Sequence, residues 1–173
     1  MGLATSTAAA SAAHAHLVGR GPRFSEFVAG QRVFDPAEVV AGAGPALDGA
    51  GVRDRCAVTR GSFFDSVPDG GDAYLLKSII HDWDDDSSLT ILGNVRTAFA
   101  RDGKLLLIEM ALPDGAPPHP GRMLDVEMLV HTGGCERTAA EYSNLLPQAG
   151  FRLSRAIPTA GPAAIVDAVL VAP

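Results

Sequence analysis

The chain has 173 residues, of which 47% are hydrophobic and 20% charged, a length and composition typical of one globular domain with a buried core. Its 14 Lys and Arg residues and 20 Asp and Glu residues give a formal net charge of −6 at pH 7. This balance argues against nucleic acid and anionic membranes as partners, because both require clustered cations to meet phosphates.

The sequence divides near Gln31. Residues 1–30 are rich in Ala, Ser, Gly and Arg, and an Ala-driven helix from Thr5 to Val18 or a frayed tail would equally fit them. The remaining residues alternate between strand and helix patterns. We therefore predict an atypical N-terminal segment, 1–30, followed by one folded domain, 31–173.

The first predicted elements of this domain are short. Arg32–Phe34 forms an apolar run that ends at Asp35, and Pro36 then opens a helix that runs toward Gly49. Cys56–Thr59 has the pattern of a strand.

Two stronger strands follow, over residues 73–80 and 104–110. Both are nearly continuous in apolar residues, which is typical of parallel strands covered on both faces. Residues 87–100 between them place apolar side chains on one helical face, and Asp102–Gly103 closes that predicted helix. Strand, helix and strand in this order predict a βαβ unit.

The C-terminal third continues the pattern. We predict a helix over 122–130 and a second that begins at Thr138, where Glu141 completes a capping box, and ends at Gly150. Residues 151–157 and 164–171 are predicted to be a closing pair of strands. The fold class is therefore α/β, with an open sheet.

In open α/β sheets the ligand binds beyond the carboxyl ends of the strands. Asp35, His81 and Glu109 each end or closely follow a predicted strand. An acid such as Asp35 is suited to accept the hydroxyls of a ribose, and a helix N-cap ahead of Pro36 is an equally good interpretation.

His81 and Glu109 should meet, because they end neighbouring strands. Histidine, with an ordinary pKa of ~6.5, suits proton abstraction near neutral pH, and a nearby carboxylate fixes its tautomer. The alternatives are a structural hydrogen-bond partner for the histidine and a solvated strand end for the glutamate. Asp84–Asp86 precedes a helix, so these acids are better explained by the helix dipole than by a metal site.

Residues 72–83, from Asp72 to Trp83, resemble the signature of the caffeate and hydroxyindole type O-methyltransferases. The likeness continues through residues 107–113, 123–128, 133–138 with Glu141, and 149–151, so it extends from about Gln31 to the C-terminus. It implies a Rossmann-like methyltransferase sheet, mostly parallel with an antiparallel C-terminal strand, and S-adenosylmethionine as cofactor.

The resemblance also implies the roles of particular residues. His81 corresponds to the family's general base, flanked by Glu109 and Glu136. It would remove the proton of a hydroxyl on a small, aromatic metabolite, and the oxygen would attack the sulfonium methyl. A phenol with a pKa of about 10 needs such help at neutral pH.

The family pattern places the cofactor against four residues. Asp35 corresponds to the ribose carboxylate, Ser62 and Phe63 to the pair at the adenine edge, and Lys77 to a lysine before the histidine. On the acceptor side stand three residues of one predicted helix: Met123, Asp125 and Met128. Thioethers adapt to flat rings, although methionine at helical spacing is also typical of a plain core.

The sequence departs from the family in two places. Ser62 stands where the family usually has Asp, and a neutral hydroxyl makes a weaker hydrogen bond than a carboxylate, so we expect weakened cofactor binding. A Gly-rich turn should also precede Asp35 by about 20 residues, but residues 13–22 show neither that spacing nor a preceding strand. The family's dimerising winged-helix domain is likewise not recognisable.

We therefore expect a truncated member with a partial catalytic domain over 31–173, lacking the first strand and the Gly-rich turn. A small-molecule hydroxyl substrate is the expected partner, without a metal. The resemblance implies a homodimer for the full-length family and leaves the oligomeric state of this chain open. The alternative is a catalytically impaired remnant that acts as a structural or interaction domain. A nicotinamide-dependent oxidoreductase is a weaker third hypothesis, because it needs the same turn and leaves His81, Glu109 and Glu136 unexplained.

Two cysteines, Cys56 and Cys135, are too few for a disulfide framework and sit at no metal-ligand spacing. No apolar run reaches the ~18 residues of a membrane span, and the N-terminus lacks the pattern of a signal peptide. These features predict reduced thiols in a cytoplasmic protein.

Overall fold

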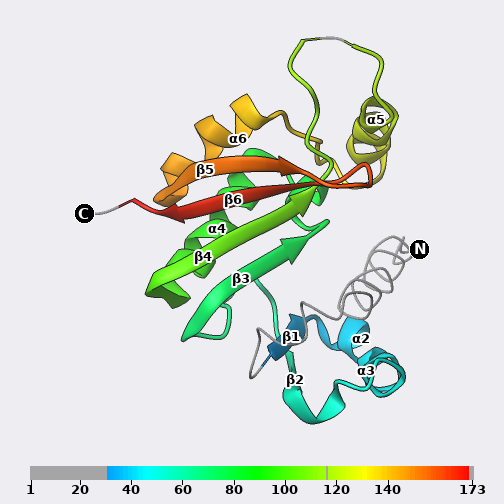
Figure 1. The fold of residues 1–173 in the computed structure, drawn as a ribbon, viewed down its shortest axis with the longest axis vertical. Coiled ribbons are helices and arrows are strands. Elements are labelled where there is room, and N and C mark those ends of the chain that lie inside the picture. Colours follow the sequence, from blue (N-terminus) through cyan, green and yellow to red (C-terminus); the bar gives the residue numbers. More distant parts are fainter. Residues whose placement is uncertain (1–30, 116, 172–173) are drawn as a thin grey trace. The chain divides into compact units, whose positions relative to one another are not determined.

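The computed structural model describes residues 31–115 and 117–171 (Figure 1). The atypical segment 1–30, with its expected helix and the region searched for a Gly-rich turn, lies outside the described residues. The chain forms two compact units that divide between Val67 and Pro68. Each unit has its own sheet, and each is described by itself.

The first unit is a small parallel pair of strands with short helices. Its elements are β1 (Gln31–Asp35), α2 (Ala37–Val40), α3 (Ala43–Gly49), a 3-10 turn (Arg53–Arg55) and β2 (Cys56–Arg60). Strand β1 pairs in parallel with β2, from Gln31 opposite Cys56 to Asp35 opposite Arg60. Leu47, Val52 and Cys56 form its buried cluster. Both predicted strands are confirmed.

The helix predicted from Pro36 toward Gly49 is wrong as one continuous element. Pro36 does precede the first helical residue, but α2 ends at Val40 and α3 begins at Ala43. Pro45 has no N–H to donate to the carbonyl of Ala41, and Gly42 favours the helix less than other residues do. The backbone therefore breaks between the two helices.

The second unit holds a four-stranded sheet in the order β3-β4-β6-β5 (Figure 1). Its elements are β3 (Gly71–Lys77), a 3-10 turn (Ile80–Asp82), α4 (Asp85–Ala98), β4 (Phe99–Glu109), α5 (Gly121–His131), α6 (Ala139–Leu145), a 3-10 turn (Leu146–Ala149), β5 (Phe151–Pro158) and β6 (Ala164–Leu170). Strands β3 and β4 are parallel, and β6 is antiparallel to both β4 and β5. The predicted α/β class, with an antiparallel C-terminal strand, is confirmed.

The core of this unit lies on one face of the sheet. Leu105 and Leu107 of β4 are fully buried, and α4, which passes behind the sheet in Figure 1, buries Ile91 and Leu92. Leu75 on the neighbouring strand β3 is 44% exposed. Within the described residues, the expectation that the strands are covered on both faces therefore fails at Leu75.

The junction between α4 and β4 differs from the sequence prediction. The helix starts as expected, since Asp84 caps it by accepting a hydrogen bond from the Ser87 amide at 2.9 Å. It ends at Ala98, however, and β4 begins at Phe99, so Asp102–Gly103 does not close the helix. The Phe99 ring packs between Tyr74 and Phe151, with centroid distances of 5.4 and 5.3 Å, and this packing accounts for the extended backbone at Phe99.

The predicted capping box of α6 is confirmed. Thr138 accepts a hydrogen bond from the Glu141 amide, and the Glu141 carboxylate accepts one from the Thr138 amide at 2.7 Å. The helical region ends where Gly150 adopts a left-handed conformation with φ of 79°, a backbone shape that glycine adopts without strain.

We predict that Thr138→Ala lowers the free energy of unfolding by about 1 kcal/mol, because the Glu141 amide at the start of α6 loses its acceptor, the Thr138 hydroxyl. Urea denaturation followed by circular dichroism measures the change. Thr138→Ser keeps the hydroxyl and should stay within about 0.5 kcal/mol of the parent. Equal losses in both variants would contradict the role of the cap.

Candidate active site

The segment that carries His81 leaves strand β3 abruptly. The strand ends at Lys77, and Ser78 has a φ of 52°, the only positive value for a non-glycine residue in the described ranges. A single 3-10 turn, Ile80–Asp82, then presents the histidine. The predicted continuation of this strand to Ile80 is therefore wrong by three residues.

The buried carboxylate of Glu109 explains this turn. Glu109 is the last residue of β4, next to β3, and is 1% exposed. Its Oε1 accepts hydrogen bonds from the amides of Ile79 at 3.1 Å and Ile80 at 2.9 Å. Two amides that converge on one oxygen cannot belong to a regular strand, so the backbone turns at Ser78.

His81 lies between carboxylates that come from distant parts of the sequence. Its Nδ1 lies 2.7 Å from Glu136 Oε1 and 3.9 Å from Glu109 Oε2. A carboxylate at 2.7 Å accepts a proton held on Nδ1, which leaves the lone pair of Nε2 available. The structure thus brings together the three residues predicted to be catalytic and directs Nδ1, rather than Nε2, toward the two glutamates.

Glu136 is held in place through its own backbone. Its amide donates to Asp125 Oδ1 of α5 at 2.8 Å. Gly134, two residues earlier, packs so closely against the backbone of His81 and Asp82 that an added Cβ would collide with the carbonyl oxygen of His81. Only glycine allows this approach, and the approach brings Glu136 to the imidazole.

The pKa values of this group follow from burial and charge. Burial lowers the pKa of His81, but the hydrogen bond to Glu136 and the charges of Glu109, Glu136 and Asp82 outweigh it, so the pKa lies above 6.5. Burial raises the pKa of Glu109 to about 7. Its Oε2 is buried and has no hydrogen-bond partner among the described residues, which disfavours the ionised form.

Asp82 is a contact that the sequence prediction missed. Its Oδ1 lies 3.6 Å from His81 Nε2, on the opposite side of the ring from Glu136. The side chain is half-buried, and burial raises its pKa. Its position next to His81 in the sequence was the available signal, since the predicted strand 73–80 ended before both residues.

The three predicted acceptor-side residues lie on α5 in different environments. Met123 is 68% exposed, whereas Met128 is buried, as the plain-core interpretation requires. Asp125 binds the backbone of Glu136, a positioning contact that its assignment to the acceptor did not anticipate. Lys77, assigned to the cofactor, is half-buried at the end of β3.

The remaining predicted cofactor residues lie in the first unit, beyond the carboxyl ends of its strands. Asp35 ends β1, and burial together with the charge of Glu38 raises its pKa to about 6. The helix α2 has Pro36 at its N-cap and no side-chain cap, so the alternative role of Asp35 as an N-cap is wrong. Ser62 and Phe63 follow β2, and Ser62 Oγ accepts a hydrogen bond from the Phe64 amide at 3.2 Å.

His81, Glu109 and Glu136 offer ligand atoms within 4.8 Å of one another, a spacing that a shared cation would require. The hydrogen bond between His81 and Glu136 accounts for this spacing without a cation. The absence of a metal therefore stays a prediction.

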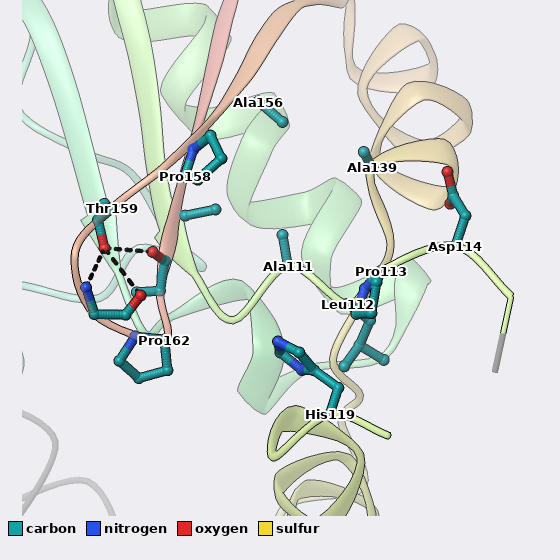
Figure 2. A pocket seen from close by; sticks show the side chains of 13 residues that line it. Ala111, Leu112, Pro113, Asp114, His119, Ala139, Ala156, Pro158, Thr159 and Pro162 are labelled. Atoms are coloured by element: carbon teal, nitrogen blue, oxygen red, sulfur yellow. Dashed lines mark hydrogen bonds between the residues drawn. The ribbon is translucent and has the colours of Figure 1, made fainter. Parts of the chain in front are cut away.

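A separate cavity of about 340 Å³ lies beyond the end of β4 (Figure 2). It is lined by the segment after β4, the start of α6 and the turn between β5 and β6, and it includes Asp114, His119 and Thr159. His81, Glu109 and Glu136 do not line it.

In the part of the chain that the structure describes, no helix is long and apolar enough to span a membrane.

Comparison with known proteins identifies the family. Residues 27–152 match the O-methyltransferase domain family. The chain belongs to this family. It is 44% identical over 155 residues to the phenazine O-methyltransferase PhzM of Lysobacter antibioticus, covering 87% of this chain and 46% of that protein. It is also 45% identical over 100 residues to acetylserotonin O-methyltransferase of Gallus gallus, covering 57% of this chain and 29% of that protein.

Solved structures of family members have the same fold. Mitomycin 7-O-methyltransferase MmcR superposes with a TM-score of 0.76 at 38% identity, covering 81% of this chain and 41% of that one. The O-methyltransferase NcsB1 from neocarzinostatin biosynthesis, in complex with S-adenosyl-L-homocysteine and 1,4-dihydroxy-2-naphthoic acid, gives a TM-score of 0.75 at 34% identity, covering 82% of this chain and 42% of that one. The chain spans about half the length of the first of these relatives and less of the others. The resemblance stated from the sequence motifs is confirmed.

We predict that Glu109→Gln changes how stability depends on pH. The pKa of Glu109 in the folded state, about 7, lies above its ordinary value of 4.5, so its stabilising contribution is complete at low pH and is lost as the pH rises through 7. Glutamine still accepts from the amides of Ile79 and Ile80 but does not titrate. Between pH 5 and 8, the free energy of unfolding of the parent should fall by on the order of 2 kcal/mol more than that of the variant.

Urea denaturation at both pH values measures this difference. Asp35, whose pKa is also raised, contributes the same trend to both proteins and cancels in the comparison. The pKa of His81 is raised partly by the charge of Glu109, so a smaller rise in the variant adds to the difference in the same direction. Parallel pH profiles for the parent and Glu109→Gln would show that the carboxyl group does not titrate in this range.

Proposed function

We propose that this chain is the catalytic part of an S-adenosylmethionine-dependent O-methyltransferase that acts on a hydroxyl of a small aromatic metabolite, with His81 as general base. The observation that carries the proposal is the 2.7 Å contact between His81 Nδ1 and Glu136, because it leaves Nε2 free to accept a proton. Membership of the O-methyltransferase family supports the same reaction.

The chemistry required of the protein is limited to proton transfer and alignment. S-adenosylmethionine supplies a methyl group on a positively charged sulfur, which is already a good leaving group. His81 Nε2 would take the proton of the substrate hydroxyl and so leave an oxygen able to attack that methyl group. Glu136, Asp82 and Glu109 then stabilise the imidazolium, because all three lie beside the ring.

The residues proposed to hold the cofactor fit its parts. Asp35 supplies a half-buried carboxylate at the end of β1, suited to the hydroxyls of the ribose, and hydrogen bonds from those hydroxyls would offset the burial that raises its pKa. Ser62 and Phe63 supply a hydroxyl and an aromatic ring for the adenine. Lys77 at the end of β3 is the fourth proposed contact.

The acceptor class is inferred from relatives. Two relatives are named for phenazine and for mitomycin biosynthesis, and NcsB1 was solved with a dihydroxynaphthoic acid bound; all three names refer to ring systems. Met123, Asp125 and Met128 are proposed for the acceptor side. Asp125 in this role would couple substrate binding to Glu136, because its carboxylate accepts a hydrogen bond from the Glu136 amide.

A second function, that of a structural or interaction domain without turnover, is favoured by one observation. Ser62 stands where the family usually has Asp, and this replacement weakens the proposed contact to the cofactor. Calorimetric titration with S-adenosylmethionine separates the two functions, because the absence of heat at millimolar cofactor would favour the non-catalytic domain.

We predict that His81→Ala lowers kcat by about 10²- to 10⁴-fold, the usual contribution of a general base, and leaves the Kd for S-adenosylmethionine unchanged. In the parent, kcat/KM should rise with pH through a pKa above 6.5, since the neighbouring carboxylates raise the pKa of His81. Methyl transfer to a panel of aromatic hydroxyls, followed by mass spectrometry, provides the rates.

His131→Ala is the matched control, because His131 lies exposed at the end of α5. It should keep the parent rate. A His81→Ala variant with near-full turnover would remove His81 from the base role.

We predict that Ser62→Asp tightens cofactor binding several-fold, since a charged acceptor makes a hydrogen bond roughly twice as strong as a neutral one. Aspartate also keeps an oxygen for the Phe64 amide. Calorimetry gives both Kd values. Ser66→Asp adds the same charge at an exposed position nearby and should change the Kd little; an equal gain in that control would mean that net charge alone acts.

A further inference from the structure

Arg137 is a buried cation to which neither the sequence analysis nor the proposed reaction gives a role. It follows Glu136 directly and is 3% exposed. Every nitrogen of its guanidinium donates hydrogen bonds. The acceptors are Ile80 O at 3.1 Å, Trp83 O at 3.0 Å, Asp85 Oδ1 at 2.7 and 3.1 Å, Cys135 O at 3.4 Å and Ser88 Oγ at 3.4 Å.

Two of these acceptors define what the guanidinium holds. The carbonyls of Ile80 and Trp83 lie on either side of the dipeptide His81–Asp82. On the other side of the same segment, Glu109 binds the amides of Ile79 and Ile80. The backbone around His81 is therefore held at its amides by a carboxylate and at its carbonyls by a guanidinium.

A role in stability alone accounts poorly for this arrangement. The ion pair with Asp85 is partly solvated, because that carboxylate is 69% exposed, and exposed or half-exposed pairs contribute little. Burying a guanidinium carries a desolvation cost that an apolar side chain of similar size would avoid. What an apolar side chain could not do is bind two carbonyls at a fixed spacing.

Arg137 directly follows Glu136 in the chain, so the two side chains act on the same segment from one place. Because it is adjacent to Glu136, the same residue pair holds both sides of the site: Glu136 binds the imidazole and Arg137 binds the backbone that carries it. A shift of the guanidinium would therefore alter the distance between His81 and Glu136 directly.

We propose that Arg137 is a positioning residue for His81, whose guanidinium fixes the carbonyls of Ile80 and Trp83 and thereby keeps the imidazole against Glu136. The consequence for catalysis rests on the proposed function, in which His81 is the base. The effect on the geometry does not, so it is measured separately.

The first test is Arg137→Lys in the full chain. Lysine keeps the positive charge, but its compact ammonium cannot reproduce the planar fork that reaches both carbonyls and Asp85. The pKa of His81 is measured by NMR titration of labelled imidazoles and assigned with His81→Gln. We expect it to fall toward 6.5, because the contact with Glu136, the largest favourable cause of its raised value, loosens.

The direction of the shift is diagnostic. Weakening the field of a nearby cation without moving the ring would raise the pKa of His81, and a purely structural role would lower the folded fraction without changing the pKa. A rise or an unchanged value in folded Arg137→Lys overturns the proposal. Arg155→Lys is the matched control, since Arg155 pairs with Asp167 through one contact at 3.2 Å on strands β5 and β6 and should leave His81 unaffected.

A milder pair of variants covers the case in which Arg137→Lys does not fold. Asp85→Asn weakens the contact that aims the guanidinium, and Asp86→Asn removes the same charge from the next exposed residue without touching Arg137. The pKa of His81 should fall further in Asp85→Asn than in Asp86→Asn. Equal shifts would attribute the effect to charge and overturn the proposal.

Kinetics then separate this inference from the proposed function. Arg137→Lys should lower kcat about 10- to 100-fold, as expected for a misplaced catalytic group, with the KM for cofactor within about twofold. A lowered pKa of His81 in a chain in which His81→Ala has no effect on turnover supports positioning and refutes the base. An unchanged pKa alongside an inactive His81→Ala does the reverse.

Discussion

The turn that presents His81 in the second unit depends on one buried carboxylate, that of Glu109. Its Oε1 gathers the amides of Ile79 and Ile80, which ends β3 and turns the chain into the segment that presents His81. Its Oε2 faces the imidazole at 3.9 Å. A single side chain at the end of β4 thus builds the loop and contributes charge to the group that the loop carries. Burial of an acid is costly, and here the two amides and the histidine offset part of that cost.

The connection before α6 supplies the other half of the site by a different physical route. Gly134 lets that segment approach the backbone of His81, and Asp125 fixes the amide of Glu136. Arg137 then reaches across to the carbonyls that flank the histidine. His81 and Glu136 are 55 positions apart in the sequence, so their contact exists only when the turn after β3 and the connection before α6 are both folded.

The helices and strands of the second unit could be predicted from the sequence more fully than those of the first. In the second unit, continuous apolar runs predicted β3 and β4, and the capping box at Thr138 predicted the start of α6, because both signals are local and strong. Errors fell at element ends. Phe99 has a helix-compatible place in the apolar pattern, yet ring packing with Tyr74 and Phe151 draws it into a strand. In the first unit, Pro45 interrupted a helix that the pattern predicted as continuous.

The sequence alone determined the α/β class, the order of strands and helices in the second unit, and the motifs that carry the family resemblance, because each depends on neighbours along the chain. It also identified His81, Glu109 and Glu136 as a set through that resemblance. Only the tertiary structure decided which imidazole nitrogen is available, since this follows from the 2.7 Å contact of Nδ1 with Glu136. The hydrogen bonds of Glu109 to two amides, of Asp125 to Glu136 and of Arg137 to two carbonyls are likewise non-local. No pattern in the sequence specifies them, because each joins groups that only folding brings within hydrogen-bonding distance.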